Sequence, residues 1–77
     1  MAETQKSAEE RALNYYNEAM KLKPEDNYSK EAEELLNKAL KLDGNLVDAW
    51  TALGHVLTNK GQLDKALQNF QKAIELV

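Results

Sequence analysis

The feature that most constrains this chain is an internal repeat with a period of 34 residues. A shift of that length places Ala32, Leu36 and Ala39 on Ala66, Phe70 and Ala73, respectively. The shared spacing keeps small and bulky side chains one helical turn apart on a single face, as close packing of one helix on another requires. Such a period is typical of arrays in which each helical unit buries its apolar face against a neighbour.

Local patterns divide the chain into four helices. Apolar residues recur at helical spacing in four segments, about 7–22, 29–43, 46–60 and 63–77. Ser7 and Glu10 have the spacing of a capping box, which predicts the start of the first helix. Pro24 predicts its end near Leu22. We therefore expect one all-α domain over residues 1–77, with four antiparallel helices.

The connections between these segments carry further signals. Gly44 and Gly61 each follow an apolar segment and suit left-handed helix C-caps. Asn45, followed three residues later by Asp48, has the pattern of a cap for the third helix. The composition agrees with helix over sheet, because the chain has only three Val, one Ile, three Thr, three Gly and one Pro.

The third and fourth segments resemble a tetratricopeptide repeat. The resemblance rests on the pattern Trp50-x2-Leu53-Gly54-x2-Leu57, then Gly61, then Ala66-x3-Phe70-x2-Ala73. The 34-residue period extends it back over Ala32, Leu36 and Ala39. Leu57 stands where the family usually has an aromatic residue, and Gly44 stands where a proline closes the repeat. The resemblance implies a short right-handed α-solenoid of helical hairpins, with these signature residues in its core.

Two further resemblances cover the N-terminal half. Residues 28–50 are similar, more weakly, to the N-terminal repeats of the tetratricopeptide cofactors called Strap. The first segment lacks a first-helix signature when counted back by 34 residues, and Ala12-x3-Tyr16-x2-Ala19 resembles the second helix of a repeat instead. Whether this helix lines a groove or caps the array stays open.

The family resemblance implies a groove that binds a protein or peptide. Its groove positions on the third helix are Asp48, Thr51, His55, Thr58 and Asn59. Members that clamp a partner's C-terminal carboxylate would place lysine at Thr51 and asparagine at His55. Neither is present, so binding of a chaperone tail is not expected.

The fourth helix predicts a second kind of contact. Leu67, Ile74 and Val77 are apolar and lack the polar helix that closes a repeat array. We expect this surface to self-associate, as a homodimer or a domain-swapped pair, or to pack against the rest of a longer protein. The close match of the second repeat to the family pattern is also compatible with a designed or truncated chain. An assembly unit is therefore the alternative to a peptide-binding module.

The remaining function classes find little support in the sequence. The chain has no cysteine and one histidine, so we expect no enzyme activity, no metal site and no cofactor. Its net charge of −3 gives no basic footprint for nucleic acid. No apolar run approaches the length of a membrane span, and the polar start gives no secretory signal. We expect a cytoplasmic chain, with a nuclear one as the alternative, and not a secreted one.

Overall fold

The computed structural model describes residues 7–22 and 28–77 and contains four α-helices. These are α1 (Ala8–Met20), α2 (Tyr28–Leu42), α3 (Val47–Asn59) and α4 (Leu63–Leu76). All the regular secondary structure in the described part of the chain is α-helical, which confirms the all-α fold. None of the described helices is long and apolar enough to cross a membrane.

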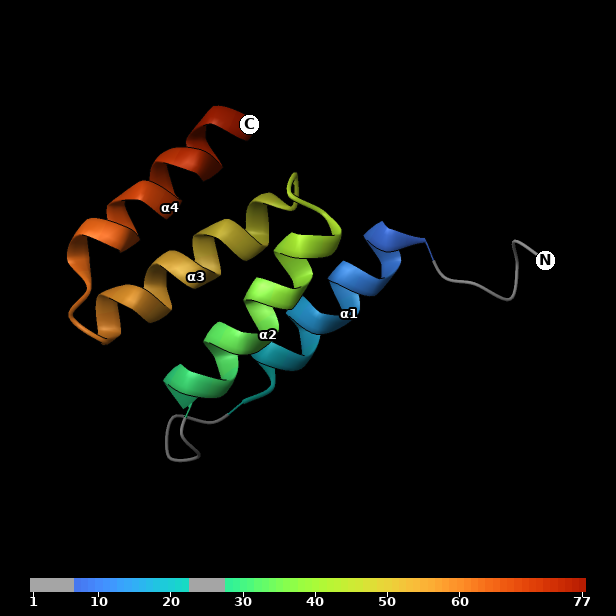
Figure 1. The fold of residues 1–77 in the computed structure, drawn as a ribbon, viewed down its shortest axis with the longest axis horizontal. Helices are drawn as coiled ribbons and strands as arrows, with labels where there is room; N and C mark the ends of the chain where they lie inside the picture. The colour runs from blue at the N-terminus through green and yellow to red at the C-terminus, as the bar shows by residue number, and fades with distance from the viewer. Residues whose placement is uncertain (1–6, 23–27) are drawn as a thin grey trace.

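The helices lie side by side in the order of the sequence. Figure 1 shows α1 beside α2, α2 beside α3 and α3 beside α4, with the chain reversing direction at each connection. Each helix packs mainly on its neighbours in sequence, so two hairpins, α1–α2 and α3–α4, meet where α2 packs on α3. This arrangement is that of a repeat array, in which units contact only adjacent units.

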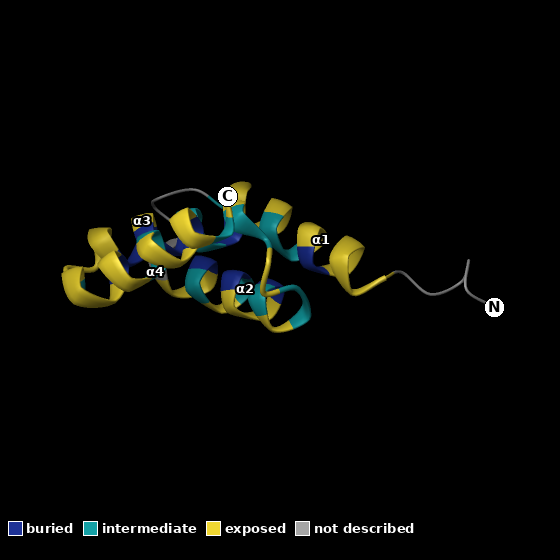
Figure 2. Cartoon of the chain, turned by 90° about the horizontal axis from the view of Figure 1, so that it is seen from above, coloured by how far each residue is buried: buried dark blue, intermediate teal, exposed yellow. Residues whose placement is uncertain are grey.

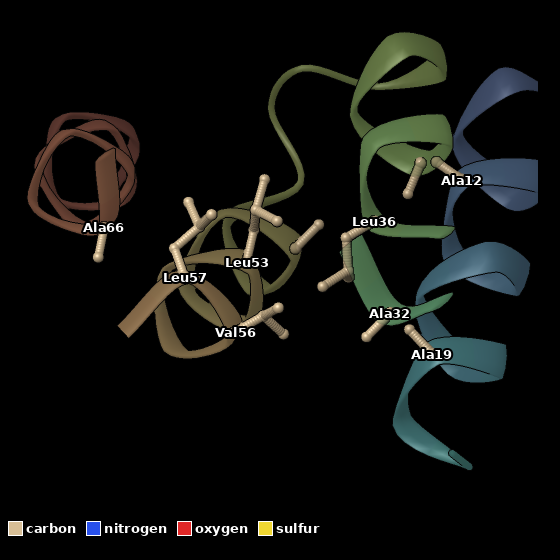
Figure 3. Packing of buried hydrophobic residues seen from close by; sticks show 10 residues of the cluster. Ala12, Ala19, Ala32, Leu36, Leu53, Val56, Leu57 and Ala66 are labelled. Atoms are coloured by element: carbon tan, nitrogen blue, oxygen red, sulfur yellow. The ribbon is translucent and has the colours of Figure 1, made fainter. Parts of the chain in front are cut away.

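Small side chains bring the helices together. Ala12 and Ala19 on α1 are fully buried, and Figure 3 shows Ala19 beside Ala32 of α2. Leu36 points from α2 toward α3, where Val56 is also fully buried. Because alanine has no side-chain entropy to lose and little bulk, it allows close helix packing at little conformational cost.

The signature residues of the repeat divide into a buried and a half-buried group. The buried group is Ala32, Leu36, Ala39, Leu53, Gly54, Leu57, Ala66 and Ala73. Trp50 and Phe70 are half-buried. Trp50 lies at the edge because its indole N–H donates a hydrogen bond to the Gly44 carbonyl oxygen, at 2.8 Å. Its ring thus closes the α2–α3 turn.

The start of α1 follows the sequence pattern. The Glu10 amide donates to the Ser7 hydroxyl oxygen at 3.1 Å, and the Ser7 amide donates to the Glu10 carboxylate at 3.2 Å. This reciprocal pair is the predicted capping box. The helix ends at Met20 with Lys21 as its C-cap. Pro24, the predicted stop signal, lies outside the described residues.

The turn between α2 and α3 differs from its prediction at two residues. Gly44 does not have the left-handed conformation expected of a C-cap, which among the described glycines only Gly61 adopts, with φ of 82°. Asn45 does not cap α3, whose N-cap is Leu46 and has no side-chain hydrogen bond. The turn is instead closed by Asp43, whose carboxylate accepts a hydrogen bond from the backbone N–H of Asn45 at 3.0 Å. Such a side-chain bond turns the chain without a left-handed residue.

Candidate functional site

The predicted groove residues form one row along α3. Asp48, Thr51, His55 and Thr58 recur at three- and four-residue steps, which place them on the same side of the helix. Asp48, His55, Thr58 and Asn59 are exposed, and Thr51 is half-buried. The structure therefore places the five predicted residues on α3 or at its end, and four of the five are exposed.

The centre of this row is supported by α4. The His55 ring meets the Phe70 ring edge-on, with centroids 5.2 Å apart and planes at 73°. Beside them, a Cβ added at Gly54 would lie 2.6 Å from Phe70 Cε1. The space beside Gly54 is therefore occupied by an aromatic ring of another helix. Phe70 thus fills the place of a side chain at Gly54 and contacts the His55 ring.

One hydroxyl of the row is already engaged. Thr58 Oγ1 donates to the Gly54 carbonyl oxygen, one turn earlier in α3, at 2.8 Å. The lone pairs of the Thr58 oxygen remain as acceptors.

Tyr16 of α1 is a half-buried aromatic residue that the groove prediction did not include. The pKa of Tyr16 is raised above its ordinary value, first because the phenol is partly desolvated and second because the Asp48 carboxylate disfavours a nearby negative charge. The second cause places Tyr16 in the electrostatic neighbourhood of Asp48 on α3. This electrostatic effect therefore joins a residue of α1 to a residue of α3.

A spacing of 37 residues, instead of 34, explains why the repeat pattern did not align α1 with α3. Ala12 and Ala19 of α1 correspond in burial to Ala49 and Val56 of α3, a separation of 37 residues in both pairs. The connection between α1 and α2 spans residues 21–27, against 60–62 between α3 and α4. The longer connection shifts α1 out of the 34-residue register. With an insertion in this connection, the buried positions of α1 align with those of α3, the first helix of the second hairpin.

A hollow on the other flank of α1 was also missed. It lies between α1 and α2, has a volume of about 280 Å³, and is lined by Arg11, Tyr15, Lys38, Lys41 and Leu42. No local motif marks it, because it depends on how the two helices pack. The spacings Arg11–Tyr15 and Lys38–Lys41, each about one helical turn, were the only signal in the sequence.

The predicted self-association surface is largely exposed. Leu67, Ile74 and Val77 are 58%, 69% and 89% exposed, and Leu63 adds a further 62% exposed side chain. Figure 2 shows the corresponding exposed surface along much of α4. The 34-residue period relates Leu67 to Glu33, which forms an ion pair with Lys60 at the α2–α3 seam. The position of Leu67 on α4 thus corresponds to a position on α2 that forms an ion pair with the C-cap residue of α3.

Metal-ligating side chains are not clustered in the described part of the chain. Within 7–22 and 28–77, no group of three or more His, Cys, Asp or Glu side chains is placed to hold a metal ion. The polar groups of the α3 row can donate and accept hydrogen bonds. The packing of the two hairpins is that of a helical repeat.

Comparison with known proteins gives the family of this helical repeat. Residues 47–76, which comprise all of α3 and α4, match the tetratricopeptide repeat model. Tetratricopeptide repeat protein 5 of Mus musculus is 42% identical over 66 residues, 86% of this chain and 14% of that protein. Its counterpart from Homo sapiens is 49% identical over 47 residues, 61% of this chain and 11% of that protein. This chain belongs to the tetratricopeptide repeat family, whose repeats generally mediate protein–protein interaction.

The similarity to the mouse protein reaches beyond the matched repeat. A 66-residue stretch of a 77-residue chain must include residues 12–66, so it covers most of α1 and all of α2 and α3. The chain nevertheless spans only about one seventh of that relative's length.

Proposed function

We propose that this chain is a non-enzymatic interaction module that binds a peptide or an extended protein segment along α3. The observation that carries this proposal is the row of accessible polar residues on α3, with His55 held against Phe70. Such a row offers hydrogen bonds to the backbone of an extended segment, and a solenoid presents it on a continuous surface. Tyr16 would add aromatic contact area from α1.

The test begins with selection of peptides from a displayed random library on the intact chain. Selected peptides are then titrated against the double variant Thr51→Ala/His55→Ala and against the control Gln68→Ala/Gln71→Ala, which changes exposed polar residues of α4. We expect at least a tenfold loss of affinity for the α3 variant and less than a twofold change for the control. Equal affinity of both variants, or no selected peptide, would contradict the proposal.

A specific observation also supports a second candidate, assembly through α4. Leu63, Leu67 and Ile74 form an exposed apolar stripe at helical spacing, together with the terminal Val77. A second copy of this chain could bury that stripe, as a homodimer or a domain-swapped pair. The measurement that separates the two candidates is solution mass against concentration, argued in the Discussion. A designed or truncated origin of the chain stays a prediction from the sequence.

A further inference from the structure

The hollow between α1 and α2 concentrates positive charge on an acidic chain. The whole chain has a net charge of −3, but Arg11, Lys38 and Lys41 line this hollow with no carboxylate among its lining residues. The ion pair between Lys60 and Glu33 is elsewhere, at the α2–α3 seam, and the structure shows no ion pair to the three cations within residues 7–22 and 28–77. The hollow is therefore a local site of opposite sign to the chain.

Tyr15 and Leu42 give the hollow an apolar floor. Both are half-buried and pack against the hydrophobic core, so their positions are set by the fold. The Lys38 ammonium lies 5.7 Å from the centroid of the Tyr15 ring, within the range of a cation–π contact. This contact directs one cation toward the floor. The site thus combines an aromatic ring, an aliphatic side chain, two lysine ammonium groups and one arginine guanidinium group.

Neighbouring acidic residues limit the extent of the positive charge. Arg11 and Tyr15 also line a hollow that contains Glu18, and Lys38 and Lys41 also line one that contains Glu34. A nucleic-acid strand needs a continuous basic track with several phosphate contacts. The cationic surface here is bounded by carboxylates on both helices, so it fits a short ligand rather than a strand.

We propose that this hollow binds a short acidic peptide segment in which carboxylates flank an apolar side chain. The carboxylates would pair with Arg11, Lys38 and Lys41, and the guanidinium of Arg11 can hold one of them through two parallel hydrogen bonds. The apolar side chain would rest on Tyr15 and Leu42. This site is separate from the α3 row, so its occupation does not depend on the function proposed for α3.

The probe is a fluorescein-labelled peptide of sequence Glu-Asp-Leu-Glu-Asp, titrated with the intact chain by fluorescence anisotropy. The test variant is Lys38→Gln/Lys41→Gln, and the matched control is Lys65→Gln/Lys72→Gln, which removes the same charge from exposed positions of α4. We expect at least a tenfold weaker Kd for the test variant, a change below twofold for the control, and progressive loss of binding as salt is raised.

Two further measurements test the apolar contact and the location of the bound peptide. A peptide in which serine replaces the central leucine should bind several-fold more weakly, because it loses the contact with Tyr15 and Leu42. Amide NMR shifts caused by the acidic peptide should be centred on α1 and the last turns of α2. The proposal would be overturned by equal loss in test variant and control, by shifts centred elsewhere, by no binding at millimolar protein, or by tighter binding of single-stranded DNA at the same residues.

Discussion

At the scale of single residues, Gly54 shows how composition and packing are linked in this fold. Glycine inside a helix costs about 1 kcal/mol relative to alanine. The structure accounts for that cost, because three ring carbons of Phe70 lie within 3 Å of the position that a Cβ would take. The sequence pattern showed that a small residue belongs at this position. Which atom fills the space was not predictable, because it depends on the rotation of Phe70 on another helix.

We predict that Gly54→Ala destabilises the chain by about 1–3 kcal/mol, the usual range for overpacking, despite its better helix propensity. The measurement is the free energy of unfolding from urea denaturation. The control is the same change in a Phe70→Leu background, where the ring is absent and the cost of Gly54→Ala should fall or reverse. An equal cost in both backgrounds would contradict the assigned contact.

The pairing of Tyr16 with Asp48 predicts a pH dependence. Burial and the Asp48 carboxylate raise the pKa of Tyr16 above its ordinary value of 10.0, so the folded state retains the phenolic proton more strongly than the unfolded state does. The stability linked to this group is full below pH 10.0 and declines as pH rises through the folded pKa.

We predict that Asp48→Asn lowers the pKa of Tyr16 but leaves it above the ordinary value, because burial is the larger cause. The measurement is the titration of the Tyr16 ring carbon by NMR, which separates it from Tyr15. The control is Asp64→Asn, since Asp64 lies in the first turn of α4 and is not a cause of the shift. A Tyr16 pKa unchanged by Asp48→Asn would show that the two groups are not electrostatically coupled.

At the scale of elements, the helices were predictable and their ends only partly so. Apolar periodicity is a property of each segment alone, which is why all four helices could be expected. The capping box could be predicted because its two residues, Ser7 and Glu10, are only three positions apart in the sequence. The turn at Gly44 could not, because Asp43 offered a competing side-chain hydrogen bond to the backbone.

We predict that Ser7→Ala costs about 1 kcal/mol of stability, the usual loss for an N-cap with a side-chain hydrogen bond. Asn45→Ala should change stability by less than about 0.5 kcal/mol, because the Asn45 side chain makes no cap bond to α3. Urea denaturation of both variants measures the difference. Native-state hydrogen exchange should place the Ser7 effect in α1. A larger loss for Asn45→Ala would restore the cap that the sequence predicted.

The candidate sites separate in the same way. The residues of the α3 row could be named from the sequence, because they share one helix and match positions of a family pattern. The hollow and the electrostatic effect of Asp48 on Tyr16 could not, because each joins residues of two helices. Their positions depend on the packing of α1, whose register was obscured by the longer connection before α2.

At the scale of the whole molecule, the surfaces at the two ends of the helical array differ in chemistry. The α1–α2 end carries the basic hollow, whereas α4 carries an apolar stripe of which Ile74 is 69% exposed. An apolar stripe of this kind is typical of an interaction surface. Because the ends differ in chemistry, an assembly through α4 would most simply pair two α4 surfaces around a two-fold axis.

We predict that the solution mass of the chain rises from monomer to dimer with concentration, measured by light scattering after size exclusion. Leu67→Glu/Ile74→Glu should give a monomer at every concentration, because burying two carboxylates in an apolar contact is strongly unfavourable. The matched control Gln68→Glu/Gln71→Glu adds the same charge to other exposed positions of α4 and should still dimerise. A monomer mass for the unchanged chain at all concentrations would exclude assembly through α4 and leave peptide binding as the proposed function.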